Sequence, residues 1–300
     1  MNVIELIRER ATSSPRGVVF FLNPYTYLVL RERPDLLKKA DSICFDGTIL
    51  CLLFKWMGIS NIHRVSFDNT SYAPILFDRA VSDNKSIALV GSEESVMAKF
   101  SEYVEKVYPG IRIVYKRNGF FDSASSISES YDSIKHHCAD IVVVGMGAGK
   151  QEEYLAGLLN SGWAGEAYTC GGFMHQTAGA GHAYYPAWID RYNLRFLYRM
   201  YDEPKLINRY FFDYPVFLCK FLWDYVDGYP LQTSLDNRGA MPTQSELSSQ
   251  ISKDLKKAGF KFCGPTIVYA FMEASGLFNN HPTNCPRHAP CRDMARLPPL

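Results

Sequence analysis

The sequence predicts an α/β protein with a Rossmann-like, largely parallel sheet and helices on both of its faces. Three observations lead to this prediction. Short apolar runs alternate with amphipathic stretches over roughly the first 180 residues. The run Ile141–Val144 is entirely β-branched, as in strands that are buried on both faces. Most of these runs stop at Gly, Asn or Asp, and open α/β sheets bind their ligands at such strand ends.

The expected strands and helices follow one another in the alternating order of this fold class. Strands are expected at 17–22, 42–45, 86–90, 111–115, 141–144 and 166–170, and helices at 3–7, 27–37, 49–57, 93–108, 127–138 and from 150 onward. Gly58 is a typical cap after an apolar helix, and Glu93 and Glu94 complement the dipole of the helix that they begin. Because parallel strands end at the same edge of a sheet, the residues after them would build a single cleft.

Composition limits the classes of function. The chain has 300 residues, 47% of them hydrophobic, and a net charge of +1, so its overall charge does not favour nucleic acid. The first four of its eight cysteines are Cys44, Cys51, Cys138 and Cys170. They lie in apolar or helical runs without a CxxC pair, which predicts reduced, buried thiols in a cytosolic protein. We expect neither a signal peptide nor a membrane-spanning segment.

Changes in composition divide the chain into three parts. We predict an α/β domain at 1–190, a basic and aromatic appendage at 191–220, and a short helical fragment at 221–300 with helices at 245–258 and 266–275. In the appendage Arg191, Arg195 and Arg199 alternate with aromatic residues, which is typical of segments that lie on a membrane or bind pyrophosphate. A packed aromatic helix with a solvated cationic side would show the same pattern. The Pro-rich tail from His281 is expected to be loose.

A glycine-rich turn follows the most apolar strand. Gly145, Gly147 and Gly149 come directly after it, and Lys150 and Gln151 begin a helix. This arrangement aims backbone N–H groups and a helix dipole at an anion, so we expect a phosphate or nucleotide site. The spacing excludes a P-loop and matches the dinucleotide fingerprint poorly. A plain βα turn that needs glycine for positive φ is the alternative.

Polar residues at other strand ends extend this candidate site. Asp46 follows a strand, where partial desolvation would suit it to act as a general base, although it would also cap the next helix well. Arg64 would hold a phosphate or simply pair with Asp68. The remaining candidates at or near strand ends are Asn23, Gly91, Asn118, Gly171 and Gly172.

Metal ligands are sparse in the sequence. It contains no Asp-x-Asp pair, with which many sugar-nucleotide enzymes hold a divalent cation, so we expect no cofactor. Cationic side chains and helix N-termini would neutralise the charge instead. His281 and Cys285 have a spacing that can hold zinc, with His288 and Cys291 nearby. This is only half of a site, and we expect no metal there.

A series of short motifs runs through roughly the first 218 residues. They are Asn23-Pro24, Phe45-Asp46-Gly47, Arg64 to Asp68, Tyr108-Pro109-Gly110, Asn118 to Phe121, Gly145 to Glu152, Gly171-Gly172-Phe173 and Pro186 to Pro204. In this order they resemble the WecB/TagA/CpsF family, glycosyltransferase family 26. An ordered series of this length is much more specific than one glycine motif.

The resemblance implies a function. The family's enzymes are bacterial, and they move an N-acetylmannosamine-type or related sugar from UDP to a polyprenyl-pyrophosphate-linked sugar, with inversion and without an obligatory metal. Their products enter cell-surface polysaccharide or teichoic acid. The resemblance therefore implies a UDP-sugar donor, a polyprenyl-linked acceptor and a peripheral position on the inner, cytoplasmic face of the plasma membrane. It leaves open whether copies of the chain form a homo-oligomer.

The resemblance also implies roles for single residues. Asp46 resembles the family's catalytic base, and Asn23, Arg64 and Gln151 match positions that line its active site. The arginines from Arg191 onward resemble the appendage that completes the site at the membrane. We predict catalytic roles for Asp46, Gln151 and Arg64, and substrate binding by Asn23, Asp68, Gly91, Asn118, Gly145, Gly147, Lys150, Gly171, Gly172, Arg191, Arg195 and Arg199.

The sequence departs from the family pattern at a few positions. Phe21 replaces a Thr, Gly149 replaces a Pro, and Met174 and His175 stand where an Asp usually follows the late glycine pair. The departures at Phe21, Met174 and His175 keep a second interpretation open, in which the fold is catalytically inactive and serves as a membrane-surface module.

The C-terminal part resembles a different family, the end of DNA-3-methyladenine glycosylase I. The motifs that carry this resemblance are Pro242-Thr243, Ser252 to Thr266, Tyr269 to Met272, and His281 with Cys285. In that family the His and Cys bind a structural zinc together with ligands near the enzyme's amino end. That end, with the base pocket and the catalytic acid, is absent here. We therefore predict a fused fragment without glycosylase chemistry and no nucleic-acid partner, with a DNA-repair protein as the alternative.

Overall fold

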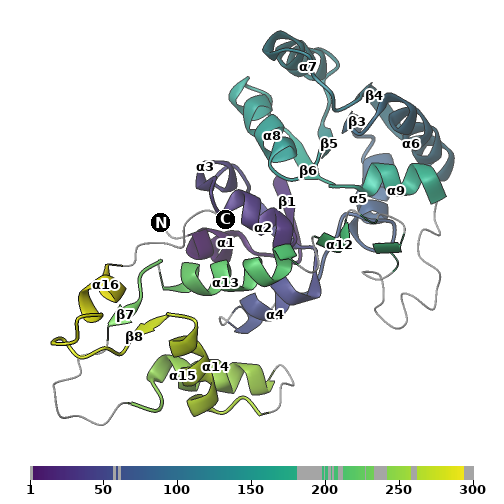
Figure 1. Ribbon diagram of the computed structural model, residues 1–300. Coiled ribbons are helices and arrows are strands. Elements are labelled where there is room, and N and C mark those ends of the chain that lie inside the picture. Colours follow the sequence, from purple (N-terminus) through teal and green to yellow (C-terminus); the bar gives the residue numbers. More distant parts are fainter. Residues whose placement is uncertain are drawn as a thin grey trace.

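The computed structural model describes residues 3–56, 59, 62–180, 198, 200–201, 204, 206–208, 212–226, 228–232, 242–257 and 262–293. Figure 1 shows an α/β body built from the first 180 residues and a smaller helical part at the C-terminal end. The body has a parallel sheet with helices on both faces, so the predicted fold class is confirmed.

Within the described residues, six strands form one sheet. They are β1 (Val18–Leu22), β2 (Ser42–Phe45), β3 (Ser86–Gly91), β4 (Arg112–Arg117), β5 (Ile141–Gly145) and β6 (Glu166–Thr169). Their order is β2-β1-β6-β5-β3-β4, and every neighbouring pair is parallel. All six carboxyl ends therefore lie along the same edge of the sheet, which we call the active edge.

The helices of the body follow the predicted alternation. They are α1 (Val3–Arg10), α2 (Pro24–Leu30), α3 (Pro34–Leu37), α4 (Thr48–Trp56), α5 (Tyr72–Ser82), α6 (Glu94–Val107), α7 (Ala124–His136), α8 (Lys150–Asn160) and α9 (Phe173–Ala180). The prediction of one helix at 27–37 is wrong, because the chain breaks at Arg33 and starts α3 at Pro34. Proline disfavours helical geometry in the residue before it, which explains the break.

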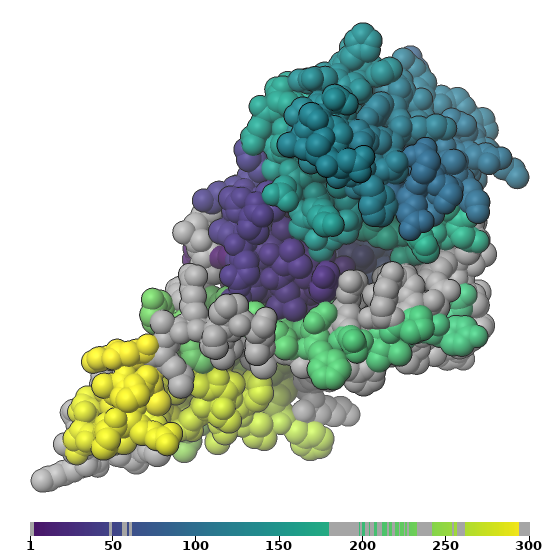
Figure 2. Space-filling model, turned by 45° about the horizontal axis from the view of Figure 1, so that its top comes forward, coloured from purple at the N-terminus to yellow at the C-terminus, as the bar shows by residue number. Residues whose placement is uncertain are grey.

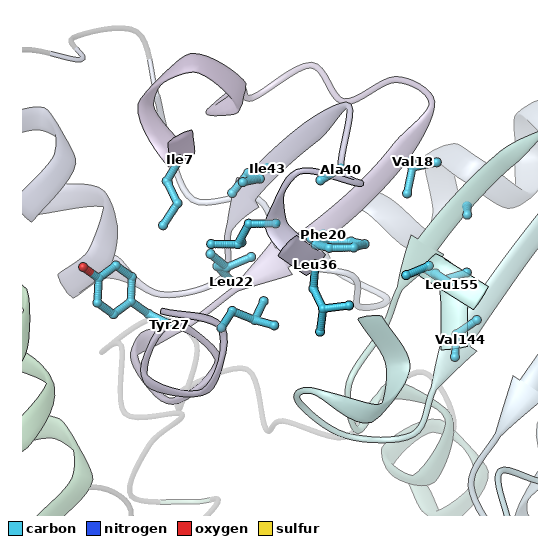
Figure 3. Packing of buried hydrophobic residues seen from close by; sticks show 14 of the residues in the cluster. Ile7, Val18, Phe20, Leu22, Tyr27, Leu36, Ala40, Ile43, Val144 and Leu155 are labelled. Carbon is cyan, nitrogen blue, oxygen red and sulfur yellow. The ribbon is translucent and has the colours of Figure 1, made fainter. Parts of the chain in front are cut away.

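The sheet separates two layers of core. Along β1, Val18, Phe20 and Leu22 face one layer while Val19 and Phe21 face the other, as the period of two in a strand requires. The first layer packs against α1, α2, α3, α4, α7 and α8, and the second against α5, α6 and α9. Figure 3 shows the first layer from close by, with the side chains of β1 among those of the surrounding helices.

The helix α13 (Tyr214–Tyr225) joins the body to the C-terminal part. Its Phe217 and Phe221 are buried in the first core layer, beside Tyr27 of α2 and Phe54 of α4. Trp223, on the same helix, belongs to a separate C-terminal core. One helix therefore contributes to two cores.

The C-terminal part is small. It contains α14 (Glu246–Lys257), α15 (Pro265–Ala274), α16 (His288–Arg292) and the paired two-residue strands β7 (Leu231–Gln232) and β8 (Phe278–Asn279). Its core contains Val226, Ile251, Val268, Met272 and Leu277. In Figure 2 the C-terminal part, in yellow and yellow-green, forms a lobe that projects from the body. The predicted boundary at 220/221 lies inside α13, and the division into three parts stays a prediction.

Some details differ from the sequence-based expectations. The tail is not loose throughout, because α16 forms in it and Asn279 binds the His288 carbonyl. Cys138 is exposed at the end of α7, whereas Cys44, Cys51 and Cys170 are buried as expected. The short helix α12 (Leu206–Asn208) lies in the predicted appendage. Among the helices of the described ranges, none is long and apolar enough to cross a membrane.

Candidate active site

The active edge brings the predicted strand-end residues together. Along the sheet from β2 to β4, the residues at or just after the strand ends are Asp46, Asn23, Gly171, Gly145, Gly91 and Asn118. The helix α2 lies close to two of these turns. A side chain at Gly47 would reach Pro24 Cδ at 3.6 Å, and one at Gly149 would reach Val29 Cγ1 at 3.0 Å. Asp46 and the glycine turn therefore share one edge and one neighbouring helix.

A charged cluster surrounds Asp46. The Val65 N–H donates to the Phe45 carbonyl at 3.1 Å, which brings the segment carrying Arg64 beside the end of β2. One Arg64 guanidinium nitrogen lies 3.4 Å from Asp46 Oδ1 and 3.3 Å from Asp68 Oδ2, and it donates to Ser66 Oγ at 2.8 Å. Arg64 therefore pairs with both carboxylates, including Asp68 as the sequence suggested.

The two carboxylates of this cluster differ in their surroundings. Burial raises the pKa of Asp68, but hydrogen bonds from Ser66 and Thr70 and the charge of Arg64 outweigh it, so the pKa lies below the ordinary value. Asp68 is thus a fixed anion that orients Arg64. The Asp46 side chain is 38% exposed, more than the 19% of Asp68. Asp46 is therefore the carboxylate of the pair that a substrate can reach more easily.

Two predicted binding residues already have structural partners. Asn23 Oδ1 accepts from the Thr26 N–H at 3.0 Å and so caps α2. Asn118 donates to Glu94 at 2.8 Å and accepts from the Phe120 N–H. The contact of Asn23 with Thr26 is typical of a helix cap, and that of Asn118 with Phe120 is typical of a turn. They fix the two side chains at the active edge without excluding a ligand contact.

The glycines of the active edge fall into two groups. A side chain at Gly91 would meet the Gly145 carbonyl oxygen at 2.3 Å, and one at Gly145 would meet Cys170 Sγ at 2.8 Å. These glycines let strand ends pack closely. A side chain at Gly147 or at Gly171 would meet nothing within 4 Å, although both have positive φ. These two turns therefore border open space, where a ligand can approach the backbone.

The start of α8 differs from the expected anion site. The Gly149 N–H donates to Glu152 Oε2 at 2.6 Å, so this amide is occupied and is not available to a phosphate. Gln151 is 2% exposed, and its side chain binds Glu152 and the Gly171 N–H. Lys150 is exposed at the first position of the helix. Lys150 thus remains open to an anion.

Glu152 is a residue that the sequence analysis did not single out. It is fully buried, and burial raises its pKa from 4.5 to about 6, against hydrogen bonds from Gln151 and Gly149. The available signal was its place three residues after Gly149, where a Glu side chain can turn back to a helix start. The sequence alone does not show that this Glu is buried.

Other predicted features lie elsewhere. Arg191, Arg195 and Arg199 fall outside the described residues.

A cavity of about 490 Å³ opens at the opposite edge of the sheet, where β5 and β6 begin, and its lining includes Lys85, Lys135 and Glu166. It is therefore separate from the active edge.

The candidate zinc pair is incomplete. Cys285 Sγ lies 3.5 Å from His281 Nδ1, while His288 Nδ1 is directed to the His281 carbonyl at 2.7 Å. A structural zinc takes four protein ligands. No group of three or more suitable side chains occurs in the part of the chain that the structure describes. These residues do not fit a zinc site.

The C-terminal part is similar to part of known DNA glycosylases. A model of methyladenine glycosylases matches residues 213–288. DNA-3-methyladenine glycosylase 1 of Escherichia coli is 45% identical over 65 residues, and the Haemophilus influenzae DNA-3-methyladenine glycosylase is 41% identical over 66 residues. These matches cover 22% of this chain and only 35% and 36% of the two glycosylases. The resemblance to one end of a glycosylase is thus confirmed.

The remainder of the chain matches a transferase family. The model of the "Glycosyl transferase WecG/TagA/CpsF family" matches residues 1–230. The Shigella boydii protein named UDP-Gal:alpha-D-GlcNAc-diphosphoundecaprenol beta-1,4-galactosyltransferase is 35% identical over 206 residues, which are 69% of this chain and 86% of that protein. With the parallel sheet and the charged active edge, these matches show that the chain belongs to the WecG/TagA/CpsF family of glycosyl transferases.

Proposed function

We propose that the protein transfers a sugar, with inversion, from a UDP-sugar to a sugar carried on a polyprenyl diphosphate. The observation that carries this proposal is the Asp46 carboxylate, which Arg64 holds at the same edge as the open glycine turns. The name of the Shigella relative favours UDP-galactose as donor and diphosphate-linked GlcNAc as acceptor. A UDP-N-acetylmannosamine-type donor is the second candidate.

The geometry supports a direct displacement. Asp46 takes the proton of the acceptor hydroxyl, and the oxygen attacks the anomeric carbon of the donor as the bond to UDP breaks. The leaving UDP carries the negative charge. Arg64 and Lys150 are cations at this edge that can offset it, together with the positive end of α8. Asn23 and the turns at Gly147 and Gly171 would line the donor.

A screen of donors and one variant test this function. UDP-sugars are offered to the wild-type protein with a short-chain polyprenyl-diphosphate GlcNAc, and product is measured by mass spectrometry. We expect Asp46→Asn to lower kcat by about 100-fold or more, because it removes the base. Asp35→Asn, on an exposed side chain of α3, serves as the control and should match the wild type. Near-normal transfer by Asp46→Asn would remove Asp46 from the mechanism.

Binding of UDP separates an enzyme from an inactive module. We expect calorimetric titration of the wild-type protein to show saturable UDP binding. A chain that binds no UDP and transfers no sugar would instead favour the membrane-surface module. We expect no excision of 3-methyladenine from DNA, because the chain spans about a third of the glycosylases that it matches.

The position in the cell follows from the proposed acceptor. A polyprenyl diphosphate is anchored in a bilayer, so the protein would act at the inner, cytoplasmic face of the plasma membrane as a peripheral protein. Sedimentation with vesicles that contain the acceptor checks this. Recovery of the protein only in the supernatant would contradict it.

A further inference from the structure

Three hydrogen bonds connect the two glycine turns of the active edge. The Gly149 N–H donates to Glu152 Oε2 at 2.6 Å, and the Gln151 side-chain amide donates to Glu152 Oε1 at 2.8 Å. The oxygen of the same Gln151 amide accepts from the Gly171 N–H at 3.2 Å. We call this chain of contacts the Glu152 bracket. It runs from the turn after β5 to the turn after β6, which are neighbouring strands.

The burial of Glu152 needs an explanation. Its side chain is 0% exposed, and none of the ion pairs found among the described residues includes it. A buried carboxylate without a cation opposes folding, and an apolar side chain of similar size commonly stabilises such a position. The cap that Glu152 gives the Gly149 N–H offsets this cost in part. The carboxylate has a second role, which is the geometry that it imposes on Gln151.

Glu152 determines how the Gln151 amide is turned. An ionised carboxylate can only accept hydrogen bonds, so the amide must direct its NH₂ group to Glu152 and its oxygen to the Gly171 N–H. If the amide were reversed, its NH₂ group would face the Gly171 N–H and its oxygen would face the Glu152 carboxylate, so neither hydrogen bond would form. Because both ends of Gln151 are engaged and its side chain is buried, it acts by holding the two turns together.

The bracket lies beside the open space of the active edge. Gly147 and Gly171, whose turns it connects, are glycines of this edge where an added side chain would meet nothing within 4 Å. Their spacing therefore decides how a nucleoside diphosphate fits against the backbone.

We propose that Glu152 is a positioning residue for the sugar-nucleotide donor, which acts through Gln151 by fixing the separation of the Gly147 and Gly171 turns. This inference rests on the proposed function, because it takes the donor to be a nucleoside diphosphate sugar.

A reciprocal exchange of the two side chains tests the bracket. In Glu152→Gln, the new amide has no second acceptor for Gln151, so the bracket breaks while the volume is kept. The double variant Gln151→Glu/Glu152→Gln restores every contact with the donor and acceptor reversed between positions 151 and 152. The amide introduced at position 152 then accepts from the Gly149 N–H and donates to the carboxylate introduced at position 151, which accepts from the Gly171 N–H. Glu153→Gln, on the exposed neighbour of Glu152, is the matched control.

The kinetic result expected is a split between KM and kcat. Glu152→Gln should raise the KM for the UDP-sugar roughly ten- to hundredfold, as expected when a buried hydrogen bond is left unmade, with a smaller change in kcat. The double variant should recover most of the donor affinity, and Glu153→Gln should equal the wild type. A double variant no better than Glu152→Gln, or an unchanged donor KM in Glu152→Gln, would overturn the inference.

A second measurement does not depend on activity. In protein labelled with ¹⁵N-glycine, Glu152→Gln should shift the amide signals of both Gly149 and Gly171, and the double variant should return them toward their original positions. A Gly171 amide signal that stays unchanged in Glu152→Gln would overturn the inference. If the wild-type protein binds no UDP, the proposed function fails together with the positioning role. If it binds UDP and Glu152→Gln binds equally well, the positioning role alone fails.

Discussion

Glu152 also makes the stability of the protein depend on pH. Because burial raises its pKa from 4.5 to about 6, the folded protein holds this proton more tightly than the unfolded chain does. The stabilisation is fully present below about pH 4.5 and is lost as the pH rises through about 6. The loss is about 2 kcal/mol, at roughly 1.4 kcal/mol for each pKa unit.

We therefore expect the wild type to gain about 2 kcal/mol of unfolding free energy relative to Glu152→Gln between pH 7.5 and pH 4.5. Urea unfolding of both proteins at the two pH values measures this difference. An equal pH dependence of the two proteins would show that Glu152 titrates alike in the folded and unfolded states.

Gly91 is expected to tolerate no side chain. In Gly91→Ala the new Cβ would lie 2.3 Å from the Gly145 oxygen, at a φ of +146° that disfavours other residues. Since backbone must move, we expect a loss of about 3 kcal/mol or more. Gly179→Ala is the control, because Gly179 is an α9 position with open space around it, and should gain about 0.5–1 kcal/mol. Thermal unfolding compares the two, and similar melting temperatures would contradict the argument.

At the scale of single residues, the sequence predicts the roles that depend on neighbours in the chain. Asp46 and Arg64 follow from strand-end position and motif, and the structure does bring them together. Asn23 was predicted to bind substrate, and its capping of α2 is an equally local property of Asn before Pro. The hydrogen bond from the Gly171 N–H to Gln151 joins residues twenty apart in the chain, and no local pattern encodes it or the burial of Glu152.

Among the elements, α13 and α2 share a carboxylate contact in addition to their aromatic packing. Tyr27 Oη and Arg31 Nε both donate to Asp224 Oδ2 at 2.8 Å, and a second Arg31 nitrogen contacts Asp224 Oδ1. Arg31 and Asp224 are only 15% and 14% exposed. Burial, together with the Asp224 charge, raises the pKa of Tyr27, so Tyr27 stays protonated and donates.

We expect Asp224→Ala to lower the unfolding free energy by about 3 kcal/mol, because it leaves the largely buried Arg31 without its main partner. Asp293→Ala removes one side of an exposed pair with Arg292 and should lower the unfolding free energy far less, because solvent screens the two charges. Urea unfolding provides both values. If the two losses are equal, the contact between α13 and α2 contributes no more than a surface pair.

The strands of the body could be predicted to within about two residues, because short apolar runs are bounded by polar residues or glycine. β7 and β8 were missed, since two residues carry no periodicity. The helix α9 was missed as well. Its small residues, with Gly172 just before the helix and Gly179 inside it, give a weak helical signal. Packing against α6 stabilises the helix instead.

For the molecule as a whole, α13 decides where the chain can be shortened. A chain ending at residue 230 keeps Phe217 and Phe221 in the core of the body, whereas one ending at 212 loses both. Removing a buried Phe side chain costs about 3–5 kcal/mol, which is a large part of a typical total stability. We expect 1–230 to unfold cooperatively and to transfer sugar, and 1–212 to be unfolded by circular dichroism. A cooperatively folded 1–212 chain would show that α13 is dispensable.

The strand order and the docking of α13 were beyond sequence periodicity. Periodicity places apolar faces on elements, but it does not say which element covers which face. The alternation of strands and helices supplied the fold class, and the family resemblance supplied the class of reaction. The shared helix, which both family matches include, emerged only from the three-dimensional contacts.

The contact between Tyr27 and Asp224 spans 197 residues of chain. At cellular rates of translation, the ribosome needs roughly 10 to 40 s to add that many residues. During this interval the apolar surface around Tyr27 and Phe54 has been made, but the helix that covers it has not. A nascent chain with such an uncovered surface is a natural client for chaperones, and translation that stops before residue 214 would release a body whose core cannot close.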